Sequence, residues 1–336
     1  MNQTEQKKVF IDHSVFLAEP EAYEKYKLVR VIEQHKDLYK VMLDQEQVMS
    51  ARVSGRIMFQ YTKITDYPAV GDWVLIEDNL EYGIIHHIMN RKSILERKSA
   101  GKTSDVQILA TNIDIIFICM SANENFNLRR LERYLSVSWS SGATLVIILT
   151  KIDLTTNLKQ MLFDIYQIAF GVDVLISSEF VEPYYKQIEN YLKSGMSYAF
   201  IGSSGVGKST IINKFLMTNK QKTIEIGSHD KGRHSTTSRE LFFTQNQAII
   251  IDTPGMRELQ LDEADIETTF QDIEQLSKKC KFTDCTHKKE PGCAVKDAIM
   301  SGDISRERLS NYHKLLKELK YQKLKAKRLE LKYKKR

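Results

Sequence analysis

The sequence has little of what marks fibrous, secreted or membrane proteins. Only 5 prolines and 15 glycines occur in 336 residues, which excludes collagen-like and low-complexity chains. There are four cysteines, and three of them fall within 14 residues, a spacing that favours a metal site over a disulfide framework. The longest apolar runs, such as residues 115–120 and 144–149, are too short to span a bilayer, and residues 1–10 lack the apolar core of a signal peptide. We therefore expect a cytoplasmic protein without a membrane segment.

The composition and the charge distribution indicate a folded body with a basic tail. Apolar residues make up 42% and charged residues 27%, which is typical of a soluble globular protein, and the length suits two or three domains. Residues 314–336 contain 11 Lys/Arg and 2 Asp/Glu, so residues 1–313 contain 38 basic and 41 acidic side chains. Such a tail suits a polyanion, first of all nucleic acid, although a solvated helix face has the same pattern.

Hydrophobic periodicity divides the chain into three parts. Short β-branched or apolar runs at 28–32, 38–43, 48–57, 73–76 and 83–89 predict a small five-stranded barrel resembling an OB-fold. From residue 113, strand patterns (113–120, 144–149, 172–176, 197–201, 248–251) alternate with helical ones (128–139, 157–169, 184–192, 211–216). That alternation predicts a parallel sheet with helices on both faces. Beyond 262 the pattern is helical and ends in a long basic helix, so we divide the chain into residues 1–100, 101–262 and 263–336.

A phosphate-binding loop follows the predicted strand 197–201. The motif GxxxxGK[ST] is matched by Gly202, Ser203, Ser204, Gly205, Val206, Gly207, Lys208 and Ser209, with Thr210 next. Its glycines allow backbone N–H groups to surround phosphates, Lys208 is expected to reach the β- and γ-phosphates, and Ser209 to bind Mg²⁺. A Gly/Ser-rich turn before a helix is the alternative, but the strand–loop–helix context favours nucleotide binding.

Two further segments have the chemistry of a GTP site. Asp252, at the end of a predicted strand, is suited to holding Mg²⁺ through water, and the Gly255 N–H to sensing the γ-phosphate. The segment Thr150, Lys151, Ile152 and Asp153 also ends a strand, and its carboxylate can accept two hydrogen bonds from guanine, for which adenine has no matching donor pair. Ser177 and Ser178 follow the strand 172–176 and are candidates to close over the base.

The order of these segments along the chain is unusual. The guanine segment (150–153) precedes the phosphate loop (202–210), and 252–255 come last, whereas common GTPases place the phosphate loop first. The nucleotide domain is therefore expected to be circularly permuted.

A Cys/His cluster interrupts the helical C-terminal part. Cys280, Cys285, His287 and Cys293 provide three thiolates and one imidazole, a complete tetrahedral ligand set for a structural Zn²⁺. Four unrelated residues in a reducing cytosol are the alternative. Cys119 lies in an apolar strand and is expected to be a small buried hydrophobe.

These motifs together resemble the RsgA/YjeQ family, the bacterial GTPases that depend on the small ribosomal subunit. The resemblance rests on residues 150–153, 202–210, 232–237, 252–255 and the Cys/His cluster 280–293, in that order. It implies a barrel, a permuted GTPase domain and a zinc-bearing tail. It further implies a late-acting 30S assembly factor that binds 16S rRNA and whose GTP hydrolysis the subunit stimulates. One departure is Thr150, where the family's guanine motif usually begins with Asn.

Residues 218–240 are polar, as expected of a switch loop. Thr236 or Thr237 is expected to present a hydroxyl to Mg²⁺ and the γ-phosphate. Met256 follows Gly255 where many GTPases have a water-orienting Gln, so intrinsic turnover should be slow. His234 is our candidate for positioning the water, and an rRNA contact is its equally weighted alternative.

The sequence therefore predicts a monomeric enzyme that hydrolyses GTP to GDP and phosphate with Mg²⁺ while bound to ribosomal RNA. Two other functions remain open at this point. One is a P-loop ATPase or kinase in which 150–153 are incidental, and the other is an RNA-binding scaffold that uses GTP as a structural ligand.

Overall fold

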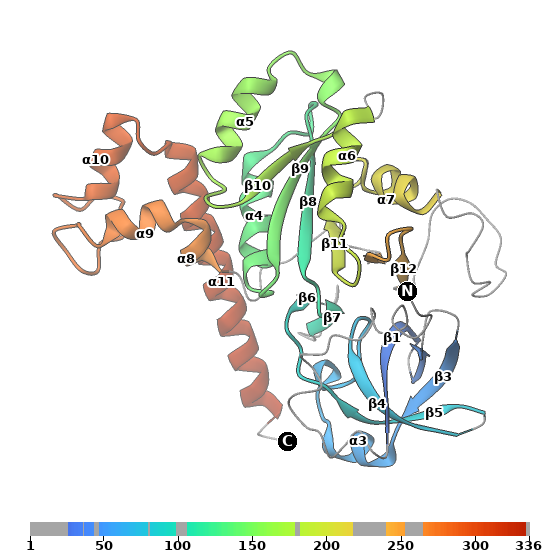
Figure 1. The fold of residues 1–336 in the computed structure, drawn as a ribbon. Helices are drawn as coiled ribbons and strands as arrows, with labels where there is room; N and C mark the ends of the chain where they lie inside the picture. The colour runs from blue at the N-terminus through green and yellow to red at the C-terminus, as the bar shows by residue number, and fades with distance from the viewer. Residues whose placement is uncertain are drawn as a thin grey trace.

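The computed structural model describes residues 26–35, 37–43, 47–79, 81–98, 106–178, 182–217, 240–252 and 265–333. A barrel, a mixed sheet covered by helices, and a C-terminal helical module follow one another along the chain (Figure 1). Within this described part, no helix is both long enough and apolar enough to cross a membrane.

The N-terminal part is a closed five-stranded barrel, as predicted. The strands are β1 (Lys27–His35), β2 (Leu38–Met42), β3 (Val48–Val53), β4 (Trp73–Asp78) and β5 (Gly83–Ile88). They pair in the order β1-β2-β3-β5-β4, and the β1–β4 pair closes the barrel. The single strand predicted over 48–57 is wrong, because β3 ends at Val53. Ser54 then caps the short helix α3 (Gly55–Gln60) by accepting the Ile57 N–H, and the 3₁₀ turn η3 (Ile64–Asp66) follows.

A two-stranded hairpin connects the barrel to the next domain. It consists of β6 (Ile94–Lys98) and β7 (Val106–Thr111), and the basic composition of residues 91–102 did not predict a strand there. The pairing is favoured because Leu95 is fully buried while the charged side chains that follow it lie nearer the surface.

One buried arginine holds the barrel against the central domain. Arg30 on β1 donates to the carbonyls of Gly71 and Asn112, both at 3.3 Å, and to Ser197 Oγ at 2.8 Å. Its guanidinium also lies over the Trp73 ring, 5.2 Å from the centroid. Burial lowers the pKa of Arg30 to about 10, which still leaves the side chain charged at neutral pH.

The central domain is built on a six-stranded sheet. Its strands are β8 (Ile115–Ser121), β9 (Thr144–Thr150), β10 (Asp173–Ile176), β11 (Ser197–Ile201), β12 (Glu240–Phe243) and β13 (Ile249–Asp252). They lie in the order β10-β9-β8-β11-β13-β12, and all neighbours are parallel except β12 and β13. Sequence analysis missed β12, which pairs with β1 and so joins this sheet to the barrel.

Helices cover both faces of this sheet, as the alternating pattern predicted. They are α4 (Leu128–Trp139), α5 (Leu158–Tyr166), α6 (Glu182–Tyr191) and α7 (Lys208–Met217). Along β8, Ile116 and Ile118 pack in the core with α4 and α5, whereas Phe117 and Cys119 pack with α6 and α7. Cys119 is 1% exposed, and burial raises the pKa of its thiol to about 12, which confirms that it is a buried hydrophobe.

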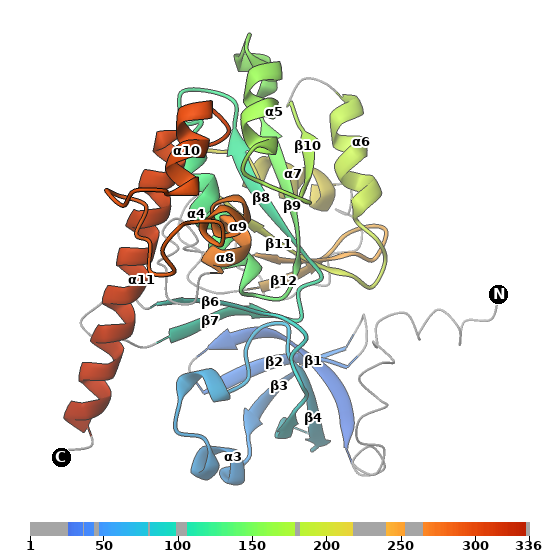
Figure 2. The same ribbon diagram turned by 90° about the vertical axis from the view of Figure 1, so that its left-hand side faces the viewer.

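The C-terminal module packs along α4. It contains α8 (Ile266–Thr269), α9 (Gln271–Ser277), α10 (Ala294–Ser301) and the long α11 (Arg306–Tyr333). Figure 2 shows α11 running beside α4 and on past the β6–β7 hairpin. Tyr312 is buried against Phe270 and donates to Glu274 at 2.7 Å, so it belongs to the core, while Tyr321 is exposed.

Candidate functional site

The phosphate loop connects β11 to α7, and its first glycine cannot be replaced without strain. Gly202 has φ +145°, and a Cβ on it would lie 2.3 Å from the carbonyl oxygen of Cys119 on the neighbouring strand β8. Gly205 and Gly207 also have positive φ. Ser209 and Thr210 are the second and third residues of α7 and, like Ser204, are exposed. The loop therefore ends at a helix N-terminus, where backbone N–H groups and the helix dipole favour phosphate.

Lys208 is already directed across this loop. Its Nζ donates to the carbonyl oxygens of Gly202 and Ser203, both at 2.7 Å. These two bonds hold the ammonium group at the centre of the backbone loop, where it can reach the β- and γ-phosphates of a bound nucleotide.

The guanine segment lies directly against the phosphate loop. Thr150 ends β9 and is 3% exposed, and its hydroxyl donates to the carbonyl oxygen of Val206 at 2.6 Å. A Cβ on Gly207 would lie 3.7 Å from the same hydroxyl. Residues 56 positions apart are thereby joined by one buried hydrogen bond. The next residue, Lys151, has φ +56° and starts the 3₁₀ turn η4 (Ile152–Leu154).

Asp153 and the two serines form the other half of this cluster. Ser178 Oγ donates to Asp153 Oδ1 at 2.7 Å. The Ile152 N–H donates to the Ser177 carbonyl at 3.3 Å, and the Ser177 N–H to the Leu149 carbonyl at 2.8 Å. Ser177 and Ser178 are 2% and 1% exposed, so packing fixes both next to the carboxylate. The structure thus brings residues 150–153, 177–178 and 202–210 together at one edge of the sheet.

The structure describes only part of the residues predicted to act on Mg²⁺ and the γ-phosphate. Asp252 is the last residue of β13, which is parallel to β11 with Ile251 opposite Ala199, so its backbone lies at the same sheet edge as the phosphate loop. Gly255, His234, Thr236 and Thr237 lie outside the described residues, as do residues 218–239 in general.

Sequence analysis missed one residue that reaches this site. Arg130, in the first turn of α4, donates from Nη1 to Ser203 Oγ at 3.1 Å. A usable signal existed, because α4 follows β8 and helix N-termini after parallel strands lie at the carboxyl edge of the sheet. Nothing in the local sequence, however, distinguishes Arg130 from Arg129 beside it.

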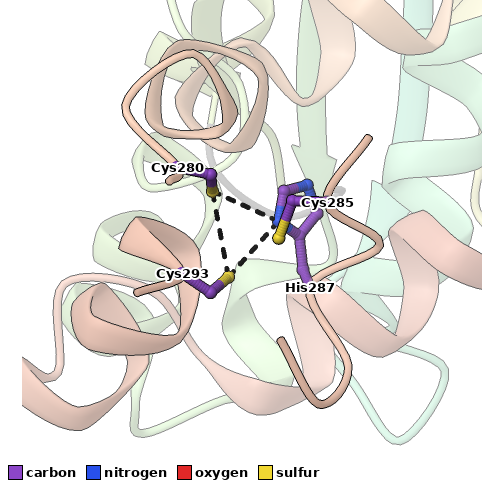
Figure 3. A group of neighbouring side chains, drawn as sticks. All are labelled: Cys280, Cys285, His287 and Cys293. Atoms are coloured by element: carbon purple, nitrogen blue, oxygen red, sulfur yellow. Dashed lines mark hydrogen bonds between the residues drawn. The ribbon is translucent and has the colours of Figure 1, made fainter. Parts of the chain in front are cut away.

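The four predicted metal ligands converge in the C-terminal module, as Figure 3 shows. Cys280 Sγ lies 3.9 Å from Cys293 Sγ and 3.7 Å from His287 Nδ1, and His287 Nδ1 lies 3.4 Å from Cys293 Sγ. All four ligand atoms, including Cys285 Sγ, lie within 4.8 Å of one another. Zn–S bonds of about 2.3 Å in a tetrahedron imply S–S edges of about 3.8 Å, so this donor set fits Zn²⁺.

The loop that carries these ligands is held by its own hydrogen bonds. The Glu290 carboxylate accepts the N–H groups of Lys288 and Lys289 at 2.9 Å and that of Thr286 at 3.1 Å. These bonds, with the Thr286 hydroxyl, hold the pKa of Glu290 well below its usual range. His287 has φ +59°, and burial lowers its pKa, which favours the neutral imidazole that zinc binding requires.

Comparisons with known proteins agree on one family. Residues 88–262 match the family model described as RsgA GTPase. The chain is 45% identical over 305 residues to the small ribosomal subunit biogenesis GTPase RsgA 2 of Lactiplantibacillus plantarum, covering 90% of this chain and 86% of that protein. It is 42% identical to the RsgA of Methanosarcina acetivorans, covering 88% and 80%.

Solved structures show the same architecture. The circularly permuted GTPase YloQ matches with a TM-score of 0.61 at 25% identity, covering 88% of this chain and 95% of that one. YjeQ from Thermotoga maritima matches with a TM-score of 0.64 at 24% identity, covering 88% and 98%, which supports the fold.

Proposed function

Because this chain belongs to the RsgA family of GTPases, we propose that it hydrolyses GTP during late maturation of the small ribosomal subunit. The curated relatives are named for GTPase activity and for biogenesis of that subunit. The observation that carries the proposal is the Thr150–Val206 hydrogen bond, which joins residues 150–153 to the loop 202–210 and supports one shared nucleotide site. Asp153 adds a carboxylate in the same segment, which matches the donor pair of guanine and has no such partner on adenine.

Asp153 would select the base. Its carboxylate can accept the N1–H and exocyclic amine of guanine, while Ser178, which donates to Oδ1, keeps it oriented. Thr150 replaces the usual Asn, yet its hydroxyl still bonds the loop carbonyl of Val206. The substitution therefore keeps a link to the phosphate loop, and any loss should concern only further bonds that an amide would make.

The phosphates would lie over the loop 202–210. Lys208 neutralises charge on the β- and γ-phosphates, and Ser209 with Asp252 would hold Mg²⁺, which stabilises charge on the leaving diphosphate. Thr236 or Thr237 would complete the Mg²⁺ site, and the Gly255 N–H would sense the γ-phosphate. Because Met256 cannot orient water, we assign that task to His234 when the protein is bound to the subunit.

Contact with 16S rRNA would come from the barrel and the basic helix α11. The basic tail, residues 314–336, is rich in lysine, and residues 91–102 add further positive charge at the β6–β7 hairpin. If these residues contact phosphates, affinity for the subunit should fall steeply with salt. Residues 1–100, 101–262 and 263–336 would then form an RNA-binding barrel, the GTPase domain and a zinc-stabilised module. We expect the whole protein to act as a monomer in the cytoplasm.

The central experiment compares GTP and ATP hydrolysis with and without 30S subunits. We expect slow GTP turnover alone, strong stimulation by 30S subunits and no stimulated ATP turnover. Asp153→Asn should shift the substrate preference from GTP toward xanthosine triphosphate. The Asn amide would place an N–H donor opposite a donor group of guanine, where the Asp carboxylate had accepted. Absence of turnover with 30S subunits would instead favour a scaffold that binds GTP as a structural ligand.

His234→Ala separates the two roles of that residue. Loss of stimulated turnover with 30S binding retained would support water positioning, whereas unchanged turnover would contradict it.

A further inference from the structure

An arginine outside every predicted motif contacts the phosphate loop. Arg130 donates from Nη1 to Ser203 Oγ at 3.1 Å. Its own position is set by the start of α4, where Asn127 is the N-cap and its Oδ1 accepts the Arg130 backbone N–H at 3.0 Å. The capped helix therefore fixes the point from which the guanidinium reaches the loop.

Ser203 accepts hydrogen bonds from two positively charged side chains. Its hydroxyl accepts from Arg130, while its carbonyl accepts from Lys208 Nζ at 2.7 Å. The preceding Gly202, the other acceptor of Lys208, lies so close to β8 that a Cβ on it would be 2.3 Å from the Cys119 carbonyl oxygen. Arg130 holds the Ser203 side chain, and movement of Ser203 would displace one of the two carbonyls that orient Lys208.

We propose that Arg130 is a positioning residue of the nucleotide site. It holds Ser203 so that Lys208 stays directed at the phosphates, and its permanent charge adds to the positive potential of the loop. This inference rests on GTP binding at residues 202–210 as proposed above. Because the loop lysine reaches the β- and γ-phosphates, Arg130 should favour GTP over GDP.

The experiment measures Kd for fluorescent GTP and GDP analogues with the full chain and its variants. Arg130→Ala should raise Kd for GTP about 5- to 10-fold, as expected for loss of one partly exposed hydrogen bond, with a smaller rise for GDP. Arg129→Ala is the matched control, because it removes the same charge from the exposed neighbouring residue of α4 and should leave both values unchanged. Arg130→Lys should lie between wild type and Arg130→Ala.

A double-mutant cycle tests whether Arg130 acts through Ser203. Ser203→Ala should reproduce most of the loss, and combining it with Arg130→Ala should add little, because both changes remove the same hydrogen bond. Thermal unfolding of each variant should match wild type, so that the changed GTP-to-GDP ratio is not a folding defect.

Three results would overturn the inference: equal GTP affinity in Arg130→Ala and Arg129→Ala, the same fold-loss for GTP and GDP, or fully additive losses in the cycle. Failure of the wild-type chain to bind GTP would overturn the proposed function itself, and the wild-type measurement shows this separately.

Discussion

Replacing Arg308 with alanine leaves a buried carboxylate without its positive partner. Arg308 on α11 donates from Nη1 to Glu132 Oε1 at 2.6 Å and from Nε to Asp272 Oδ2 at 2.7 Å. It also donates to the Thr269 carbonyl at 2.9 Å. The side chains of Arg308 and Glu132 are only 6% and 3% exposed, so this network joins α4 to the C-terminal module in a region with little solvent screening.

Breaking such a pair from one side costs about 3–5 kcal/mol, because the remaining charge stays buried. For a domain of this size the unfolding midpoint should fall on the order of 10 °C. Removing both charges with Arg308→Met and Glu132→Leu should cost less than Arg308→Ala alone.

The defect should also depend on pH. Burial raises the pKa of Glu132 above its ordinary value of 4.5, while the charge of Arg308 lowers it, so Arg308→Ala should raise this pKa further. When a carboxyl group has a raised pKa in the folded state, the free energy of unfolding falls as pH rises from 4.5 through that raised pKa. Arg308→Ala should therefore be less stable, relative to wild type, at neutral pH than at about pH 5.

Circular dichroism during heating or urea unfolding provides the measurement. Arg306→Ala is the control, because Arg306 is an exposed arginine at the start of the same helix. The network would not stabilise the protein if Arg308→Ala had the same unfolding midpoint as Arg306→Ala. The same conclusion would follow if the double variant were less stable than Arg308→Ala.

Further predictions concern the nucleotide and metal sites. Thr150→Val should raise Kd for GTP about fivefold through loss of one hydrogen bond, whereas Thr150→Ser should retain affinity in the same titration. Gly202→Ala should abolish GTP binding, because the new methyl group meets a backbone carbonyl, whereas Gly55→Ala, with open space around it, should bind GTP normally. Chelation or Cys280→Ser should abolish Zn²⁺ binding at the Cys/His cluster and lower the unfolding midpoint, whereas Cys119→Ala should bind as much Zn²⁺ as wild type in elemental analysis.

Helices and strands whose hydrophobic pattern lies within a short stretch of sequence were predictable from the sequence. The helix over 128–139 and the strand over 197–201 were predicted with the bounds that the structure shows, because each has a clear hydrophobic period and a distinct terminus. The strand predicted over 48–57 failed at its end, because Ser54 caps a helix within the segment that was assigned to one strand. Strand β12 and the β6–β7 hairpin were missed because their segments are short and their strand pairing depends on distant partners.

The candidate site also combines local motifs, which the sequence could predict, with contacts between distant residues, which it could not. The residue types at 150–153, 202–210 and 280–293 were sufficient to predict guanine, phosphate and zinc binding, since each of these ligands requires particular groups at short spacings. Contacts across long stretches of chain are different, because they depend on which helix the sheet brings beside which loop. The Thr150–Val206 bond, the reach of Arg130 to Ser203 and the burial of Glu132 against Arg308 were therefore decided only by the tertiary structure.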